Sequence, residues 1–168
     1  YNEIYNTFAP MSLQQISTVL QRLNILPFDE NKGERLVAEY VPDVQKILDE
    51  KQLLIHDDGA DIIPVKLDSD TAPMPPVLWR SSTGAQTYAA ADLAAIYYRT
   101  TTDKPDDIIY FTDNRQKLHF TQVFRAANKA GMNSARLQHV GFGTITGPDG
   151  KPFKTRDGGV MRLESLLE

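Results

Sequence analysis

Three cations gather in a glycine-rich stretch near the end of the sequence. Lys151, Lys154 and Arg156 lie between a turn at residues 147–150 and a glycine pair at residues 158–159. Glycine lets a backbone approach a ligand closely, and cations neutralise the charge on a departing phosphate group. The stretch therefore favours a flexible loop that binds a polyphosphate. The spacing alone is also typical of a solvated β-hairpin with a basic tip.

A phenol and a carboxylate lie four residues apart in an alanine-rich segment. Tyr88 and Asp92 would project from one face of a helix, and five alanines surround them in residues 87–95. A carboxylate accepts a guanidinium through two parallel hydrogen bonds, so the pair predicts a pocket for a cationic ligand. In the alternative, the alanines pack the helix against a sheet and leave Tyr88 and Asp92 in solvent.

A third polar group follows the strand predicted at residues 107–111. Its members are Asp113, Gln116 and His119. Open α/β sheets bind ligands beyond the carboxyl ends of their strands, so all three are candidates. His119 could contact a nucleotide, although a histidine between two apolar neighbours is more often a packing residue.

The elements that must position these groups alternate between strand and helix. Predicted strands cover residues 77–80, 107–111 and 137–145, and predicted helices cover residues 87–99 and 116–129, the second capped by Gly131. Such alternation predicts βαβ units and a parallel sheet. Residues 77–146 should therefore form half of a doubly wound α/β sheet.

The sequence before this sheet is predicted to be rich in helix. Ser12 is a suitable N-cap for a helix that ends near Asn24, and a second helix is predicted over residues 41–54. Two short strands around an Asp-Gly turn are predicted in residues 53–65.

Composition excludes several classes of function. The chain of 168 residues has a net charge of −4, which argues against coating nucleic acid by bulk electrostatics. It has no cysteine, so disulfides, thiolate chemistry and cysteine-containing zinc sites are excluded. The three histidines, His56, His119 and His139, lack the spacing of metal ligands.

No apolar run approaches the roughly 18 residues of a membrane span, and no signal peptide precedes Tyr1, so a cytoplasmic protein is expected. The chain starts without methionine and closes on what reads as the start of a helix, so we expect a piece of a longer protein.

Taken in order, these segments resemble arginyl-tRNA synthetase, a class I aminoacyl-tRNA synthetase family. The resemblance is carried by residues 28–30, 33–34, 42–54, 58–60, 87–95, 108–124, 139–143 and 150–159. It implies the second half of a Rossmann-type catalytic domain over residues 77–168, with parallel strands and a KMSKS-like loop. Residues 1–76 would be an α-rich insertion with a small β-hairpin. The HIGH signature of the family's first half does not occur in this sequence.

The resemblance also implies roles for particular residues. Asp92 would pair with the guanidinium of arginine, Tyr88 would hydrogen-bond the amino acid, and Gln116 would help to fix the amino-acid end. The adenosine of ATP would lie, largely through backbone contacts, against five consecutive residues: His139, Val140, Gly141, Phe142 and Gly143.

The KMSKS-like loop departs from the family signature. Pro152 and Phe153 stand where Lys-Met usually begins, and Thr155 takes the place of the second lysine. Phe153 and Lys154 would contact ATP. The departure leaves open whether Lys154, Lys151 or Arg156 supplies the charge that stabilises the transition state.

The implied activity is that of an arginine–tRNA ligase. The carboxylate of L-arginine attacks the α-phosphorus of ATP, which enters with Mg²⁺, and pyrophosphate leaves. The arginyl-adenylate then transfers its arginine to tRNA(Arg) and AMP is released. No general base is needed because the attacking carboxylate is already ionised, so catalysis is positioning and charge stabilisation. No protein-bound metal and no membrane partner are expected. The fragment itself would be inactive. The alternative is a non-catalytic module that binds nucleotide or arginine; an RNA-binding piece is disfavoured by the acidic balance.

Overall fold

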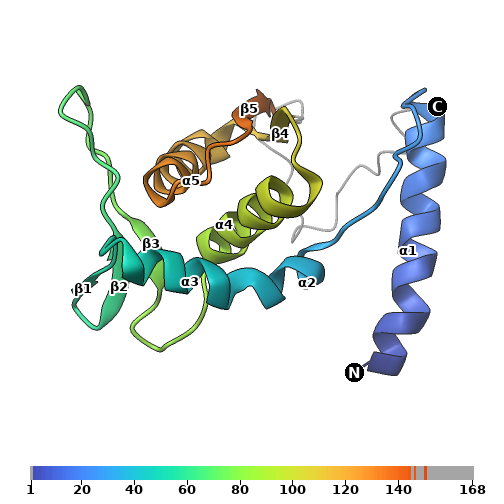
Figure 1. Ribbon diagram of the computed structural model, residues 1–168. Helices are drawn as coiled ribbons and strands as arrows, with labels where there is room; N and C mark the ends of the chain where they lie inside the picture. The colour runs from blue at the N-terminus through green and yellow to red at the C-terminus, as the bar shows by residue number, and fades with distance from the viewer. Residues whose placement is uncertain (1, 145, 147–149, 151–168) are drawn as a thin grey trace. The chain divides into compact units, whose positions relative to one another are not determined.

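The computed structural model describes residues 2–144, 146 and 150, and the chain divides into two compact units (Figure 1). The larger unit is Lys32–Gly143. The smaller unit contains helix α1. Tyr88, Asp92 and Gln116 therefore belong to one unit, in which their mutual geometry is defined.

Helix α1 (Asn2–Arg22) corrects the prediction that a helix starts at Ser12. Apolar residues continue at helical spacing toward Ile4, so the amphipathic pattern outweighs the local capping signal of Ser12. Pro10 lies in the interior of this helix, where it removes one backbone hydrogen bond and its ring crowds the carbonyl one turn earlier. The helix ends at Arg22, close to the predicted end near Asn24, and Asn24 adopts a left-handed conformation with φ of 56°.

The larger unit starts with a nearly continuous helical segment. It comprises α2 (Glu34–Val37), the 3-10 turn η1 (Ala38–Tyr40) and α3 (Val41–Glu50). Pro42 lies in the first turn of α3, where its missing N–H costs nothing. Helix α3 stops before residue 54, the predicted end, because Gln52 adopts a left-handed φ of 53°. Val44 and Leu48 are fully buried on its inner face.

Three short strands form an antiparallel sheet. They are β1 (Ile55–Asp57), β2 (Ala60–Ile63) and β3 (Val77–Arg80), in the order β1-β2-β3. Asp58 and Gly59 both have positive φ, 46° and 77°, which is the geometry of a type I′ hairpin turn. The predicted hairpin around the Asp-Gly turn is confirmed.

The partner of β3 differs from the prediction. Residues 77–80 were expected in the parallel sheet, but β3 pairs with β2 in antiparallel register, with Ile63 opposite Val77. Val77 and Trp79 are buried while Leu78 and Arg80 are exposed. A strand with one wet face suits an antiparallel sheet, whereas inner parallel strands are apolar on both faces.

The second half of the unit is a βα succession. Its elements are α4 (Tyr88–Tyr98), the π-helical turn η2 (Arg99–Asp103), β4 (Asp107–Asp113), the 3-10 turn η3 (Asn114–Gln116), α5 (Lys117–Ala130) and β5 (Arg136–Phe142). The predicted helices and the strand at residues 107–111 are confirmed, as is Gly131, which caps α5 with φ of 82°. Strands β4 and β5 are parallel and pair from Asp107 with Arg136 to Asp113 with Phe142.

Helix α4 forms the centre of the core. It packs on α3 on one side and on α5 on the other, an arrangement visible in Figure 1. Ala90 and Ala94 are buried in α4, and their small side chains let these helices approach closely. Leu93 on α4 and Trp79 on β3 fill the space between the layers.

Helix α5 also holds the loop of residues 64–76 that joins β2 to β3. The Arg125 guanidinium donates to both carboxylate oxygens of Asp70, at 2.6 and 2.7 Å, and to the Val65 carbonyl at 3.1 Å. Lys129 donates to the Pro64 carbonyl, and Gln122 donates to the carbonyls of Pro75 and Pro76. Gln122, Arg125 and Lys129 together form what we call the loop clamp. It holds the loop that leads from β2 to β3, the strand that pairs with β2.

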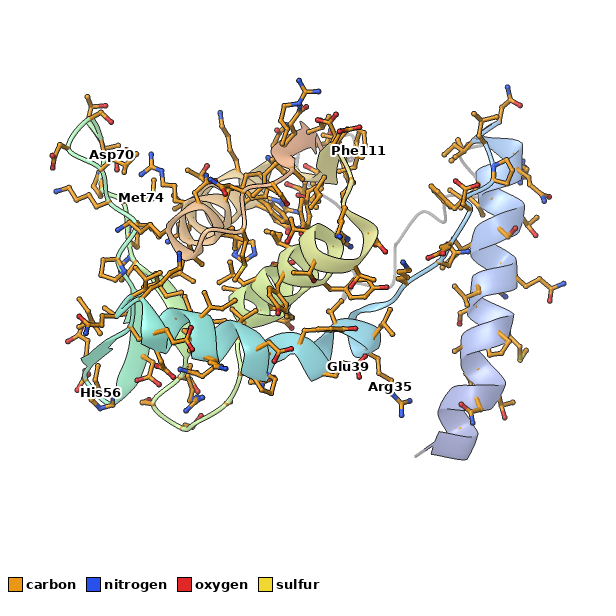
Figure 2. The ribbon with its side chains drawn as sticks, in the orientation of Figure 1. Arg35, Glu39, His56, Asp70, Met74 and Phe111 are labelled. Atoms are coloured by element: carbon orange, nitrogen blue, oxygen red, sulfur yellow. The ribbon has the colours of Figure 1, made fainter. Side chains whose placement is uncertain are left out.

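The β4–β5 pair presents two different faces. Tyr110 and Leu137 pack against the core, whereas Phe111 and its register partner Val140 are exposed on the opposite face. Figure 2 labels Phe111 at the edge of the unit. Within the described residues, no helix is long and apolar enough to span a membrane.

Candidate functional site

A cavity of about 350 Å³ lies between α4, β4 and the start of α5. Tyr88 and Asp92 of α4 line it, together with Gln116 of η3 and His119 of α5. The structure thus brings the pair predicted from its helical spacing together with two of the residues predicted from their position after a strand. Its walls combine aromatic rings and alanines with a few polar groups, which is the usual make-up of a small-molecule site.

Asp92 lines this cavity, while four alanines of the same helix are buried: Ala89, Ala90, Ala94 and Ala95. The Asp92 Oδ2 atom lies 2.6 Å from His119 Nε2, and both side chains are partly exposed. The Thr87 hydroxyl caps the helix by accepting the backbone N–H of Ala90. The alanines pack α4 into the core, as one of the two sequence interpretations predicted, and the Asp92 carboxylate remains accessible on the cavity side. Its pairing with a cationic ligand stays a prediction.

Tyr88 and Gln116 occupy the outer part of the cavity. Tyr88 is the first residue of α4, and it is 83% exposed. Gln116 ends η3 and is also exposed. Asp113 has a different role, because it caps η3 and pairs with Arg115 at 2.9 Å. Hydrogen bonds from Arg115 hold the pKa of the Asp113 carboxyl below its usual range.

The inner part of the cavity contains groups that sequence reasoning missed. Arg99 Nη1 donates to the Tyr110 hydroxyl at 3.1 Å and lies over the Tyr110 ring. Burial raises the pKa of Tyr110 to about 12, so its phenol stays protonated at neutral pH. The spacing of Asp92 and Arg99, seven residues on one helix, was the available signal for Arg99.

The predicted adenosine residues divide between the two faces of β5. His139 accepts or donates a hydrogen bond with Thr112 Oγ1 at 2.8 Å and stacks on Phe120 with 5.1 Å between ring centroids. A Cβ on Gly141 would overlap the side-chain oxygen of Asn114, so this position requires glycine unless Asn114 moves. Val140 and Phe142 are exposed on the other face, and Gly143 follows the strand.

The whole chain, residues 1–168, matches a family model described as tRNA synthetases class I (R), catalytic domain. The chain belongs to this family. It is 42% identical over 170 residues to an arginine–tRNA ligase of Agathobacter rectalis, and 41% identical over 169 residues to one of Hyphomonas neptunium. These alignments cover 100% and 99% of the chain but 28% of each relative. The chain thus spans little more than a quarter of the length of these class I arginine enzymes.

Solved structures agree with the fold of this synthetase family. The arginyl-tRNA synthetase of Plasmodium falciparum superposes with a TM-score of 0.71 at 28% identity, covering 85% of this chain and 25% of that one. A putative arginyl-tRNA synthetase of Campylobacter jejuni has a TM-score of 0.68 at 18% identity, which supports the fold alone. The mixed α/β architecture with parallel strands is thus that of a class I catalytic domain, as predicted.

Four predicted synthetase residues, Lys151, Phe153, Lys154 and Arg156, lie outside the described residues. In the part of the chain that the structure describes, no group of three or more His, Cys, Asp or Glu side chains could hold a metal ion.

Proposed function

We propose that the full-length protein containing this chain is an arginine–tRNA ligase. It activates L-arginine with ATP to form arginyl-adenylate and transfers the arginine to tRNA(Arg). The observation that carries the proposal is the Asp92 carboxylate, which faces a cavity on a chain of the arginine-specific family. We propose that this reaction takes place in the cytoplasm, where translation uses the arginyl-tRNA.

Asp92 recognises the guanidinium of arginine in this proposal. A planar guanidinium donates to a carboxylate in a fixed fork, which lysine cannot imitate because its ammonium group is a point charge. Tyr88 and Gln116 lie toward the cavity opening and hold the rest of the amino acid. The support for this arrangement is that all three side chains line a single cavity of suitable size.

ATP, entering with Mg²⁺, is proposed to lie along residues 139–143 at the end of β5. The support for this placement is that these residues lie at the carboxyl end of the parallel strand β5, where open α/β sheets bind ligands. Lys151, Lys154 and Arg156 are proposed to meet the leaving pyrophosphate. Residues 1–76 are proposed as the insertion and residues 77–168 as the second half of the catalytic domain.

The test is a charging assay on the full-length enzyme with tRNA(Arg), ATP and each proteinogenic amino acid in turn. We expect arginine alone to be attached, and pyrophosphate exchange to require tRNA. Attachment of another amino acid, or arginine binding without any charging by the full-length enzyme, would contradict the proposal.

A further inference from the structure

The Asp92 carboxylate is held by a single neighbouring side chain among the described residues. His119 Nε2 lies 2.6 Å from Asp92 Oδ2. An ionised carboxylate only accepts hydrogen bonds, so the histidine nitrogen must be the donor. Ala91 and Ala95, beside Asp92 in the cavity wall, offer no side-chain hydrogen bond, and the Arg99 guanidinium donates to Tyr110 rather than to Asp92. His119 therefore sets the rotation of the Asp92 carboxylate about its Cβ–Cγ bond.

His119 is itself fixed by the start of α5. Its ring meets the Phe120 ring edge-on, with 5.1 Å between centroids, and Phe120 is buried. Helix α4 packs directly against α5, so the backbones that carry the two side chains are held together by the core. The donor and the carboxylate therefore meet without an ordering cost at the moment of binding.

The geometry points to His119 as a positioning residue of the arginine site. It donates Nε2–H to Oδ2 of Asp92 and leaves Oδ1 and the outer lone pair of Oδ2 for the substrate guanidinium. This inference rests on the proposed function. It also gives the histidine a role that packing alone would not require, because a phenyl ring would fill the same space.

The decisive comparison is between three substitutions of His119 in the full-length enzyme. His119→Phe keeps the ring volume but removes the donor, and we expect KM for arginine to rise about tenfold while KM for ATP stays unchanged. His119→Gln places its amide nitrogen near the position of Nε2 and should restore most of the loss. His119→Asn places its amide near Nδ1 instead and should not.

A second histidine–aspartate pair provides the matched control. His56 Nδ1 lies 3.1 Å from Asp61 Oδ1 on the β1–β2 hairpin, away from α4 and α5 (Figure 2). His56→Phe should leave KM for arginine unchanged. In an Asp92→Asn background, His119→Phe should add little further loss, because its effect passes through Asp92.

Two results would overturn the inference while the proposed function stands. One is an unchanged KM for arginine in His119→Phe when Asp92→Asn is impaired. The other is an equal rise in the arginine and ATP constants that glutamine does not restore, which indicates a structural role. If the wild-type enzyme does not use arginine, the proposed function and the inference fall together.

Discussion

Asp92 brings a negative charge to a cavity whose other polar groups are mostly neutral or cationic. Tyr110 is held as a neutral phenol by its burial, and Arg99 lies against it. A guanidinium that enters must therefore find Asp92, because the inner end of the cavity offers it no other anion among the described lining residues. Charge placement of this kind favours one orientation of the ligand over its reverse.

Replacing Asp92 by asparagine should selectively impair the use of arginine. The change removes the anionic half of a paired hydrogen bond, which costs about 2–4 kcal/mol, or roughly 30- to 1,000-fold in kcat/KM. Steady-state charging by the full-length enzyme measures this loss. Asp58→Asn is the matched control, because Asp58 lies in the exposed hairpin turn and asparagine tolerates its positive φ.

Tyr88→Phe offers a graded comparison at the same site. It removes one neutral hydrogen bond and should cost on the order of 1 kcal/mol. If the Asp92→Asn variant charges tRNA at the wild-type rate, Asp92 does not bind the arginine guanidinium.

Lys154→Ala should slow adenylate formation more than it weakens ATP binding. A loop cation that meets the departing pyrophosphate gains most of its interaction in the transition state. Pre-steady-state kinetics of the full-length enzyme separate the two effects. Lys151→Ala and Arg156→Ala are the parallel variants. If Lys154→Ala raises only the KM for ATP, one of the other two residues supplies the transition-state charge.

At the scale of elements, local signals predicted helices well and pairing partners poorly. The helix at α5 and its Gly131 cap follow from apolar spacing and a glycine, both of which are local. The pairing of β3 with β2 joins separate segments, and the loop between them is held by Arg125 of α5 through Asp70, far away in the sequence. No local pattern contains that information. The site shows the same division: Tyr88 and Asp92 share a face by spacing, whereas the contact of Asp92 with His119 exists only after α4 and α5 pack.

The loop clamp should give the chain an acid-sensitive component of stability. Hydrogen bonds from Arg125 lower the pKa of Asp70 to about 2 from an ordinary value of 3.8. A lowered carboxyl pKa stabilises the fold above the unfolded value, and this stabilisation is lost as pH falls from about 4 toward 2. Urea unfolding of wild type and Asp70→Asn should differ at pH 6 and converge toward pH 2.

The comparison isolates Asp70 from other paired carboxyls. The pKa of Asp107 is also lowered, by Arg136, but that pair is present in both proteins. A difference between wild type and Asp70→Asn that stays constant from pH 6 to pH 2 would contradict this account of the clamp.

At the scale of the whole molecule, the proposed function divides the active site between this chain and the rest of the full-length protein. The HIGH signature is absent from its sequence, so ATP would have only residues 139–143 and the basic loop to hold it. Orientation is lost together with contacts when one half of a site is missing. On the exposed face of the β4–β5 pair, Phe111 is 67% and Phe142 is 56% exposed.

We therefore expect residues 1–168 to fold, to self-associate and to lack arginine-dependent activity with or without tRNA. Exposed apolar surface and unpaired strand edges both favour association. Sedimentation velocity should show oligomers that Phe111→Lys reduces, and calorimetry should show weak or undetectable binding of arginine and ATP. Micromolar ATP affinity, or arginyl-tRNA formation by residues 1–168 alone, would contradict this division of the site.

The Arg125 guanidinium limits which part of the loop of residues 64–76 can vary in length. Arg125 reaches the backbone of Val65 and the side chain of Asp70 together, and the Leu67 N–H donates to that same carboxylate at 2.8 Å. A residue inserted between Val65 and Asp70 would separate contacts that a single side chain must make at once. Residues 71–73, in contrast, are exposed and carry no such double contact. We therefore expect insertions and deletions within the family to occur after Asp70. The segment from Val65 to Asp70 should keep a constant length, because one arginine contacts both of its ends.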